Sequence, residues 1–211
     1  MQPKNDADNQ TELQKRSFIE EARRAQIIAA AIETLATEGF ARTSLVRIAK
    51  RAGISAGVIS YHFAGKDELL EQIVTTIYTA GAHFMLPRIL AETSTIRMLR
   101  AYIESNAEFI RDHPRQMVAL AEIFPNFRTK EGKLRYTVQD NELNLGGLEM
   151  LLRQGQESGE FRTFDVHIMA LTLRAAIDTI AGQKIAHPEL DLDLYAQELV
   201  TIFALAIHKT V

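Results

Sequence analysis

The most informative part of the chain is residues 43–70, which read TSLVRIAKRAGISAGVISYHFAGKDELL. Their pattern predicts two short helices, at about 45–51 and 55–63, joined at Gly53, a residue type that tolerates positive φ. Ala49 is the small residue expected where the second helix crosses the first. The outer face of the second helix carries small or polar residues, namely Ser55, Ala56, Gly57, Ser60, Tyr61 and His62. Because a short, small-faced helix can enter a major groove, the segment predicts a DNA-reading unit.

Amphipathic helices are expected on both sides of this segment. Apolar residues recur at helical spacing over about 18–38, and Gly39 is well placed to end that helix in a left-handed cap. A longer helix is expected over 66–89, where Pro87 should bend or end it. Residues 1–17 are polar and without periodicity, so a disordered leader is expected there.

The rest of the chain also follows a helical pattern. Helices are expected at about 94–112, 114–124, 134–158, 165–186 and 191–208. No stretch alternates cleanly enough to predict a strand. The fold class is therefore all-α, with an N-terminal three-helix helix-turn-helix head followed by a larger helical body. The expected domains are the leader 1–17, the head 18–65 and the body 66–211.

Composition excludes several classes of function. The 211 residues include no cysteine, which excludes a disulfide framework, a thiolate zinc site and a cysteine nucleophile. The six histidines are scattered without metal-ligand spacing, so neither a metal nor a cofactor is expected. The N-terminus has no apolar core and no apolar run approaches the ~20 residues of a membrane span. We therefore expect a soluble, cytoplasmic protein.

Charge is distributed unevenly along the chain. Residues 1–66 hold ten basic and seven acidic side chains (10 − 7 = +3), and the remainder holds 14 basic and 20 acidic ones (14 − 20 = −6). A basic head on an acidic body is the asymmetry expected if only the head faces phosphates.

Residues 24–70 resemble the DNA-binding head of the tetracycline-repressor-like (TetR) family of transcriptional regulators. The matching marks, in order, are Glu38-Gly39-Phe40, Thr43-Ser44, Ile48-Ala49, Ala52-Gly53-Ile54-Ser55, Tyr61-His62-Phe63 and Lys66-Asp67-Glu68-Leu69. The body resembles the family in layout only: its length, its number of helices and the stretch from Arg153-Gln154-Gly155 to Gly159-Glu160-Phe161. The resemblance implies a homodimer that binds a palindromic operator in double-stranded DNA.

Carried over residue by residue, the resemblance assigns roles within the head. It places Ala56, Gly57 and Ser60 at base edges. Phosphate contacts are implied for Thr43, Ser44, Tyr61, His62 and Lys66. Hydroxyl groups and free N–H groups at a helix start are natural phosphate ligands. Ser55 and Arg47 complete the predicted DNA-binding set, although Arg47 equally fits a solvated helix face.

One position departs from the family pattern. Ala56 stands where many relatives have a lysine, so residues 55–57 offer a hydroxyl, a methyl and backbone groups but no side chain for a bidentate base contact. Base reading is therefore expected to depend on thymine methyl groups, on Ser60 and on DNA shape.

The body is rich in methionine and phenylalanine, which suits a cavity for an apolar ligand as well as an ordinary core. The expected pocket residues are Phe84, Tyr102, Asn106, Met117, Phe124, Met150, Met169, Leu173 and Ile177. For each of them, plain packing in the core is the alternative.

The last two helices share an apolar stripe, which fits either packing within one chain or a dimer interface. The resemblance implies the latter, as a four-helix contact. The expected interface residues are Ala175, Thr179, Gly182, Tyr195, Leu199, Ile202, Phe203 and Ala206.

The leading hypothesis is a repressor that a small apolar or amphipathic molecule releases from its operator. Alternatives are a DNA-binding regulator without a small-molecule inducer and a helical carrier or enzyme. Against an enzyme stand the missing cysteine and the absence of a Gly-x-Ser-x-Gly motif or phosphate-binding loop.

Overall fold

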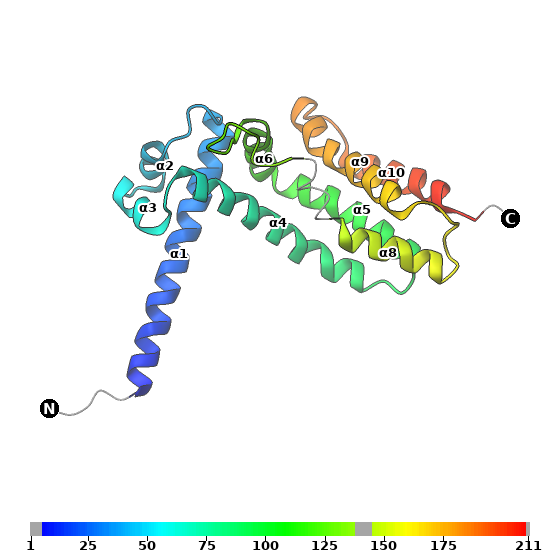
Figure 1. The fold of residues 1–211 in the computed structure, drawn as a ribbon, viewed down its shortest axis with the longest axis horizontal. Helices are drawn as coiled ribbons and strands as arrows, with labels where there is room; N and C mark the ends of the chain where they lie inside the picture. The colour runs from blue at the N-terminus through cyan, green and yellow to red at the C-terminus, as the bar shows by residue number, and fades with distance from the viewer. Residues whose placement is uncertain (1–5, 138–144, 210–211) are drawn as a thin grey trace. The chain divides into compact units, whose positions relative to one another are not determined.

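The structure is a computed structural model that describes residues 6–137 and 145–209. Within these ranges it contains nine helices and one isolated bridge pair, Arg128 with Leu134, so the all-α prediction is confirmed (Figure 1). The helices are α1 (Asp6–Glu38), α2 (Leu45–Ala52), α3 (Ala56–His62), α4 (Lys66–Leu90), α5 (Thr95–Asp112), α6 (Pro114–Asn126), α8 (Gly146–Glu157), α9 (Val166–Ala186) and α10 (Leu192–Ile207).

The chain divides into two compact units between Thr75 and Thr76. This division lies ten residues beyond the expected boundary after residue 65 (75 − 65 = 10). The first turns of α4 are grouped with the head because they contribute Leu69, Leu70 and Ile73, all completely buried, to its apolar interior.

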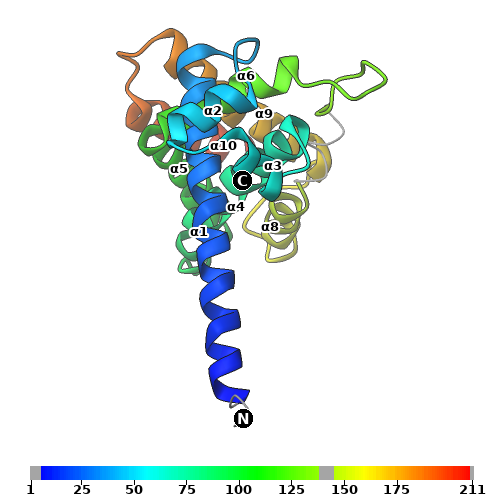
Figure 2. The same ribbon diagram turned by 90° about the vertical axis from the view of Figure 1, so that its left-hand side faces the viewer.

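In the head, the turn between α2 and α3 forms as the sequence predicts. Gly53 adopts the left-handed conformation with φ of 68°, and its N–H donates to the carbonyls of Ala49 and Lys50. The Ser44 side chain caps the start of α2 by accepting from the N–H of Arg47. The interior of the head is filled by Ile27, Leu35, Ile48, Ile59 and Phe63. Figure 2 shows α2 and α3 beside the C-terminal half of α1.

Two expectations about the helices are wrong. Residues 6–17 are helical, since α1 begins at Asp6; its Leu, Gln, Lys and Glu residues are good helix formers that prolong an existing helix without a new nucleation step. Residues 134–137 are not helical, because a turn at Gly132 (φ 78°) lets the N–H of Arg135 donate back to Phe127 at 2.8 Å. Residues 1–5 and 138–144 lie outside the described residues.

In the body, α5 packs against α6, α8, α9 and α10 (Figure 1). The observed limits of α5, α6, α9 and α10 lie within two residues of the expected ones. The helix α4 continues through Pro87 to Leu90, so this proline does not end it. No described helix is long and apolar enough to cross a membrane.

The segment between α8 and α9 fastens the start of α5. Both carboxylate oxygens of Glu160 accept hydrogen bonds, one from the N–H of Thr95 and the other from that of Ile96, each at 3.3 Å. Burial alone would raise the pKa of Glu160, but these N–H donors stabilise the charged form and the pKa is lowered. The neighbouring Phe161 is buried with its ring directly against Gly155, where no side chain larger than hydrogen fits.

Candidate functional site

Most of the predicted outer face of α3 is open to solvent, although Ala56 and His62 are half-buried. Ile59 is completely buried on one side of the helix, while Gly57 and Ser60 are exposed on the other and Tyr61 is 80% exposed. Ser55 is the N-cap residue, but its side chain makes no capping hydrogen bond. Its hydroxyl is therefore not committed to the helix. This exposure is what the predicted base and phosphate contacts require; the contacts themselves remain predictions.

Gly57 is not needed by the fold of the head. A Cβ atom added to it would approach nothing closer than the hydroxyl oxygen of Ser55, at an ordinary contact distance of 3.8 Å. Its backbone is helical, so it gains nothing from the conformational freedom of glycine. An exposed glycine that is dispensable for packing leaves room for another molecule to approach the backbone.

His62 and Arg24 join three helices of the head. The guanidinium of Arg24 donates to the carbonyl of His62, lies 4.3 Å from the centre of the Phe63 ring, and reaches Gln72 of α4 at 3.4 Å. The Nδ1 atom of His62 is buried and has no hydrogen-bond partner among the described residues. Its other ring nitrogen, Nε2, is therefore the atom left for the predicted phosphate contact.

The basic side chains of the head are largely engaged within it. Arg47 and Arg51 both form ion pairs with Glu38, and the hydrogen bond from Arg47 is the main reason that the pKa of Glu38 is lowered. The Nζ atom of Lys66 donates to the carbonyl of Phe40 at 3.3 Å and lies 4.3 Å from its ring centre. Burial lowers the pKa of Lys66. Two of its three ammonium donors remain for phosphates.

Two of the predicted phosphate ligands, Thr43 and Ser44, form side-chain hydrogen bonds within the head. Thr43 is buried and donates its hydroxyl to the carbonyl of Gly39 at 2.8 Å, which argues against a phosphate contact by its side chain. Ser44 is half-buried, and its oxygen accepts from the N–H of Arg47 at 3.4 Å to cap α2.

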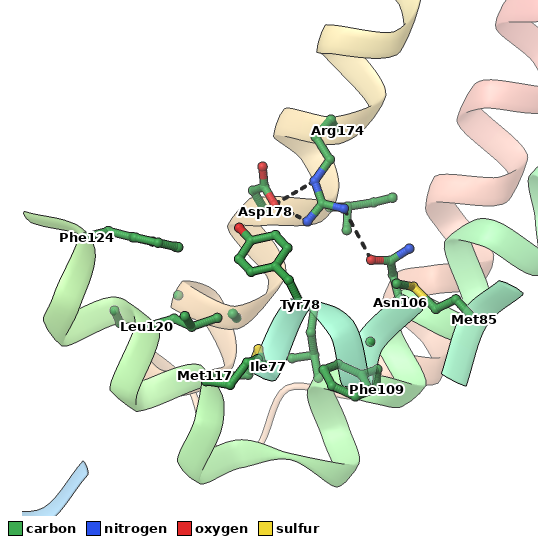
Figure 3. Close-up of a pocket in the computed structure, with 16 residues that line it drawn as sticks. Ile77, Tyr78, Met85, Asn106, Phe109, Met117, Leu120, Phe124, Arg174 and Asp178 are labelled. Carbon is green, nitrogen blue, oxygen red and sulfur yellow. Dashed lines mark hydrogen bonds and ion pairs between the residues drawn. The ribbon is translucent and has the colours of Figure 1, made fainter. Parts of the chain in front are cut away.

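The body contains a cavity of about 320 Å³ between α4, α5, α6 and α9 (Figure 3). Four of the expected pocket residues line it, namely Asn106, Met117, Phe124 and Ile177. The other five are not among the residues that line this cavity, and a ligand role for them stays a prediction: Phe84, Tyr102, Met150, Met169 and Leu173. Met150 is 69% exposed on α8, a helix that does not line it, and Leu173 is completely buried in the core.

On the polar side of the cavity, sequence analysis missed Tyr78 and Arg174. Arg174 pairs with Asp178 one helical turn away, and its Nη1 atom reaches the Tyr102 hydroxyl at 3.3 Å and Oδ1 of Asn106 at 3.4 Å. Burial alone would lower the pKa of Arg174, but Tyr102 and Asp178 outweigh it and the pKa is raised. Burial raises the pKa of Tyr78, which also lines the cavity. The sequence feature that could have indicated Arg174 is its spacing of four residues from Asp178 among the apolar neighbours Leu173 and Ile177.

The predicted interface residues divide into exposed and buried sets. Ala175, Thr179 and Gly182 are exposed along α9, and Ile202 is 55% exposed on α10. Tyr195 and Ala206 are half-buried. The prediction is wrong for two residues, because Leu199 and Phe203 face the core of their own chain and Phe203 is only 5% exposed. Sequence analysis missed Leu205, which is 74% exposed on the same helix.

The helix-turn-helix head and all-helical body define the chain as a DNA-binding regulator of transcription. Residues 27–73 match the family model described as bacterial regulatory proteins, tetR family. The chain is 33% identical over 183 residues to the HTH-type transcriptional regulator BetI of Ectopseudomonas mendocina. The aligned region covers 82% of this chain and 93% of that protein. The chain belongs to the TetR family of transcriptional regulators.

Other similarities are shorter or concern the fold alone. The match to BetI 1 of Chromohalobacter salexigens is 42% identical over 85 residues but covers only 40% of this chain and 42% of that protein. A structure of the fatty acid degradation regulator FadR from Bacillus halodurans superposes with a TM-score of 0.74 at 19% identity, covering 88% of this chain and 97% of that one. The structure of FadR from Bacillus subtilis in complex with stearoyl-CoA superposes with a TM-score of 0.71 at 24% identity. The superposition covers 87% of this chain and 99% of that one.

Proposed function

We propose that the chain is a homodimeric repressor that binds a palindromic operator through α3 and leaves it when an apolar or amphipathic molecule enters the cavity of the body. The observation that carries the DNA-binding half is the outer face of α3, where Ser55, Gly57, Ser60 and Tyr61 are all exposed above a buried Ile59. A helix with small residues on its open face can approach base edges closely.

Selection of bound DNA sequences from a random pool tests this half directly. A two-fold symmetric site should emerge, with half-sites separated by about one helical turn or a multiple of it. Binding should weaken steeply with salt, since the head must displace counterions from the phosphates. Binding without any sequence preference would contradict the proposal.

The cavity supports the effector half of the proposal. Its volume of about 320 Å³ lies at the lower end of the ~300–1,000 Å³ that is usual for ligand pockets. Ile77, Tyr78, Gly81 and Met85 of α4 line it, and only the three residues 63–65 separate the start of α4 at Lys66 from the end of α3 at His62. A ligand that favours one position of α4 can therefore bias the head through a continuous helix.

Coupling of about 1–3 kcal/mol would change operator affinity roughly 5–150-fold, and operator DNA must weaken the ligand by the same factor. A thermal-shift screen of lipophilic compounds, followed by operator titration with each hit, measures this coupling. Hits that raise the melting temperature without changing operator affinity would leave a DNA-binding protein whose body serves only to form dimers.

The dimer half rests on the exposed apolar residues of α9 and α10. Ile202 and Leu205 lie on the solvent side of α10, and Ala175, Thr179 and Gly182 form a small-residue face on α9. A two-fold pairing of these faces would bury them and would match a palindromic operator. The proposal includes no catalytic activity and no cofactor, and it places the protein in the cytoplasm with the DNA that it binds.

A further inference from the structure

The polar residues of the cavity gather in one cluster on an otherwise apolar wall (Figure 3). Arg174 and Asp178 come from α9, Asn106 from α5 and Tyr78 from α4. Apolar side chains from α4, α5 and α6 supply most of the remaining wall, among them Ile77, Met85, Phe109, Met117, Leu120 and Phe124. A molecule that fills this cavity must therefore carry an apolar part and place any polar group at the cluster.

The cluster carries no net charge. The Nε atom of Arg174 donates to Oδ1 of Asp178 at 2.8 Å, and a second guanidinium nitrogen contacts the same oxygen. A carboxylate entering the cluster would be attracted by Arg174 but repelled by Asp178, and an ammonium group would meet the reverse, so neither ion gains a net attraction that offsets its lost hydration. An uncharged polar group loses much less hydration free energy on entering the cavity than an ion does, and it can still form hydrogen bonds there.

The cluster also offers a donor and an acceptor that are not used internally. Within the ranges that the structure describes, the Tyr78 hydroxyl and the Oδ2 atom of Asp178 make no hydrogen bond to the protein. The Tyr78 hydroxyl is protonated at neutral pH, as tyrosine ordinarily is, and burial raises its pKa further, so it is a donor. The hydroxyl end of Tyr78 lies toward Asp178 in Figure 3, and the two groups interact electrostatically.

The geometry points to an uncharged head group that both donates and accepts hydrogen bonds, as a primary amide does, on an apolar chain or ring as the ligand class of this cavity. Such a group would donate to Oδ2 of Asp178 and accept from the Tyr78 hydroxyl, while the ion pair with Arg174 stays intact. The inference rests on the proposed effector function, since it names the chemistry recognised by that same cavity.

Calorimetric titration of the full-length protein, without DNA, tests the head group. The probes are octanamide, octanoate and octyltrimethylammonium, which present three head groups on one kind of chain. Octanamide should bind at least about tenfold more tightly than either charged probe. A charged probe that binds as tightly as octanamide would overturn the inference, and so would the failure of all three to bind.

Substitutions in the cluster should move the preference in opposite directions. Asp178→Asn leaves Arg174 without its counter-charge, so the ratio of affinities should shift about tenfold toward octanoate. Arg174→Gln leaves Asp178 uncompensated and should shift the ratio toward octyltrimethylammonium. Tyr78→Phe should weaken octanamide several-fold and change the charged probes little. The control is Asp193→Asn, which removes an exposed carboxylate that pairs with Arg111 on the surface.

An unchanged order of affinities in both charge variants would overturn the inference, provided that circular dichroism shows each variant folded. Operator titration separates this result from the proposed function. If octanamide binds with the expected preference but operator affinity does not change, the head-group inference stands and the inducer mechanism fails. If operator affinity falls only with a charged probe, the inducer mechanism stands and the head-group inference fails.

Discussion

The turn that leads into α3 in the head depends on contacts between neighbours in the chain, whereas the start of α5 and the polar side of the cavity in the body depend on contacts between distant residues. In the head, Ser44 caps α2 and Gly53 turns the chain toward α3, so both features involve residues close in sequence. In the body, Glu160 holds the start of α5 from 65 residues away, and Arg174 reaches Tyr102 across 72 residues. An exposed residue of α3 that makes no contact within the head can be changed with little effect on folding, whereas body residues such as Arg174 serve the fold and the site together.

The largest expected effect comes from two residues of α10 that lie two positions apart. Phe203→Asp puts a charge into the core of the body and should unfold it, at a cost of about 3–5 kcal/mol or more. Leu205→Asp lies on the exposed face, so the chain should stay folded and the dimer should dissociate. Sedimentation together with circular dichroism distinguishes the two results. A folded Phe203→Asp monomer, or an intact Leu205→Asp dimer, would contradict this division of the helix.

Two glycines of the head separate folding from DNA binding. Gly53→Ala should lower the free energy of unfolding by about 1–2 kcal/mol, because alanine is strained at a φ of 68°. Gly57→Ala should leave stability unchanged or raise it by up to about 1 kcal/mol, yet it should alter the preferred operator. Chemical denaturation and DNA selection measure the two properties. Recovery of the wild-type site at full strength from Gly57→Ala would remove Gly57 from the base-reading surface.

In the body, Gly155 differs from Gly57 because an added Cβ atom has no room there. Gly155→Ala should destabilise the chain by about 1–3 kcal/mol, because the added methyl group overlaps the buried ring of Phe161. The double variant Gly155→Ala, Phe161→Leu should recover part of that loss. Denaturation curves that show no difference between the wild type and Gly155→Ala would mean that the ring moves aside freely.

Lys66→Ala should act on every DNA sequence alike. Loss of one phosphate contact should reduce the slope of log affinity against log salt by about one unit, whatever the base sequence. Because Lys66 also contacts Phe40, part of the loss would be structural, and Lys66→Arg should recover the electrostatic part. A loss confined to one base position would contradict a phosphate role.

The smallest expected effect is a dependence of stability on pH in the body. The pKa of Glu160 is lowered in the folded chain, so its contribution to stability is complete above its usual value of 4.5. This contribution is lost as the pH falls through the lower, folded pKa. Glu160→Gln should therefore show a shallower fall in melting temperature between about pH 5 and 3, where Glu160 changes protonation. The control is Glu157→Gln, which changes an exposed carboxylate at the end of α8.

The same difference in range explains which features could be predicted from the sequence. The turn at Gly53 and the open face of α3 follow from local spacing, and both were found. The contacts of Arg174 with Tyr102 and Asn106 could not be predicted, because these two residues lie on a different helix and no local sequence pattern links them to Arg174. Helical periodicity marked α10 as apolar but did not show that Phe203 faces its own chain while Leu205 faces outward.

The position of the boundary within α4 has a consequence for protein engineering. Three residues in the first turns of α4 are buried in the interior of the head, namely Leu69, Leu70 and Ile73. Two others, Glu68 and Gln72, contact Arg24 of α1. All five of these α4 residues follow the loop at Gly65. A chimera that exchanges DNA specificity between relatives should therefore be spliced between Thr75 and Thr76, so that the donor head brings its own first turns of α4. A junction at Gly65 would separate the interior of the head from the residues that fill it.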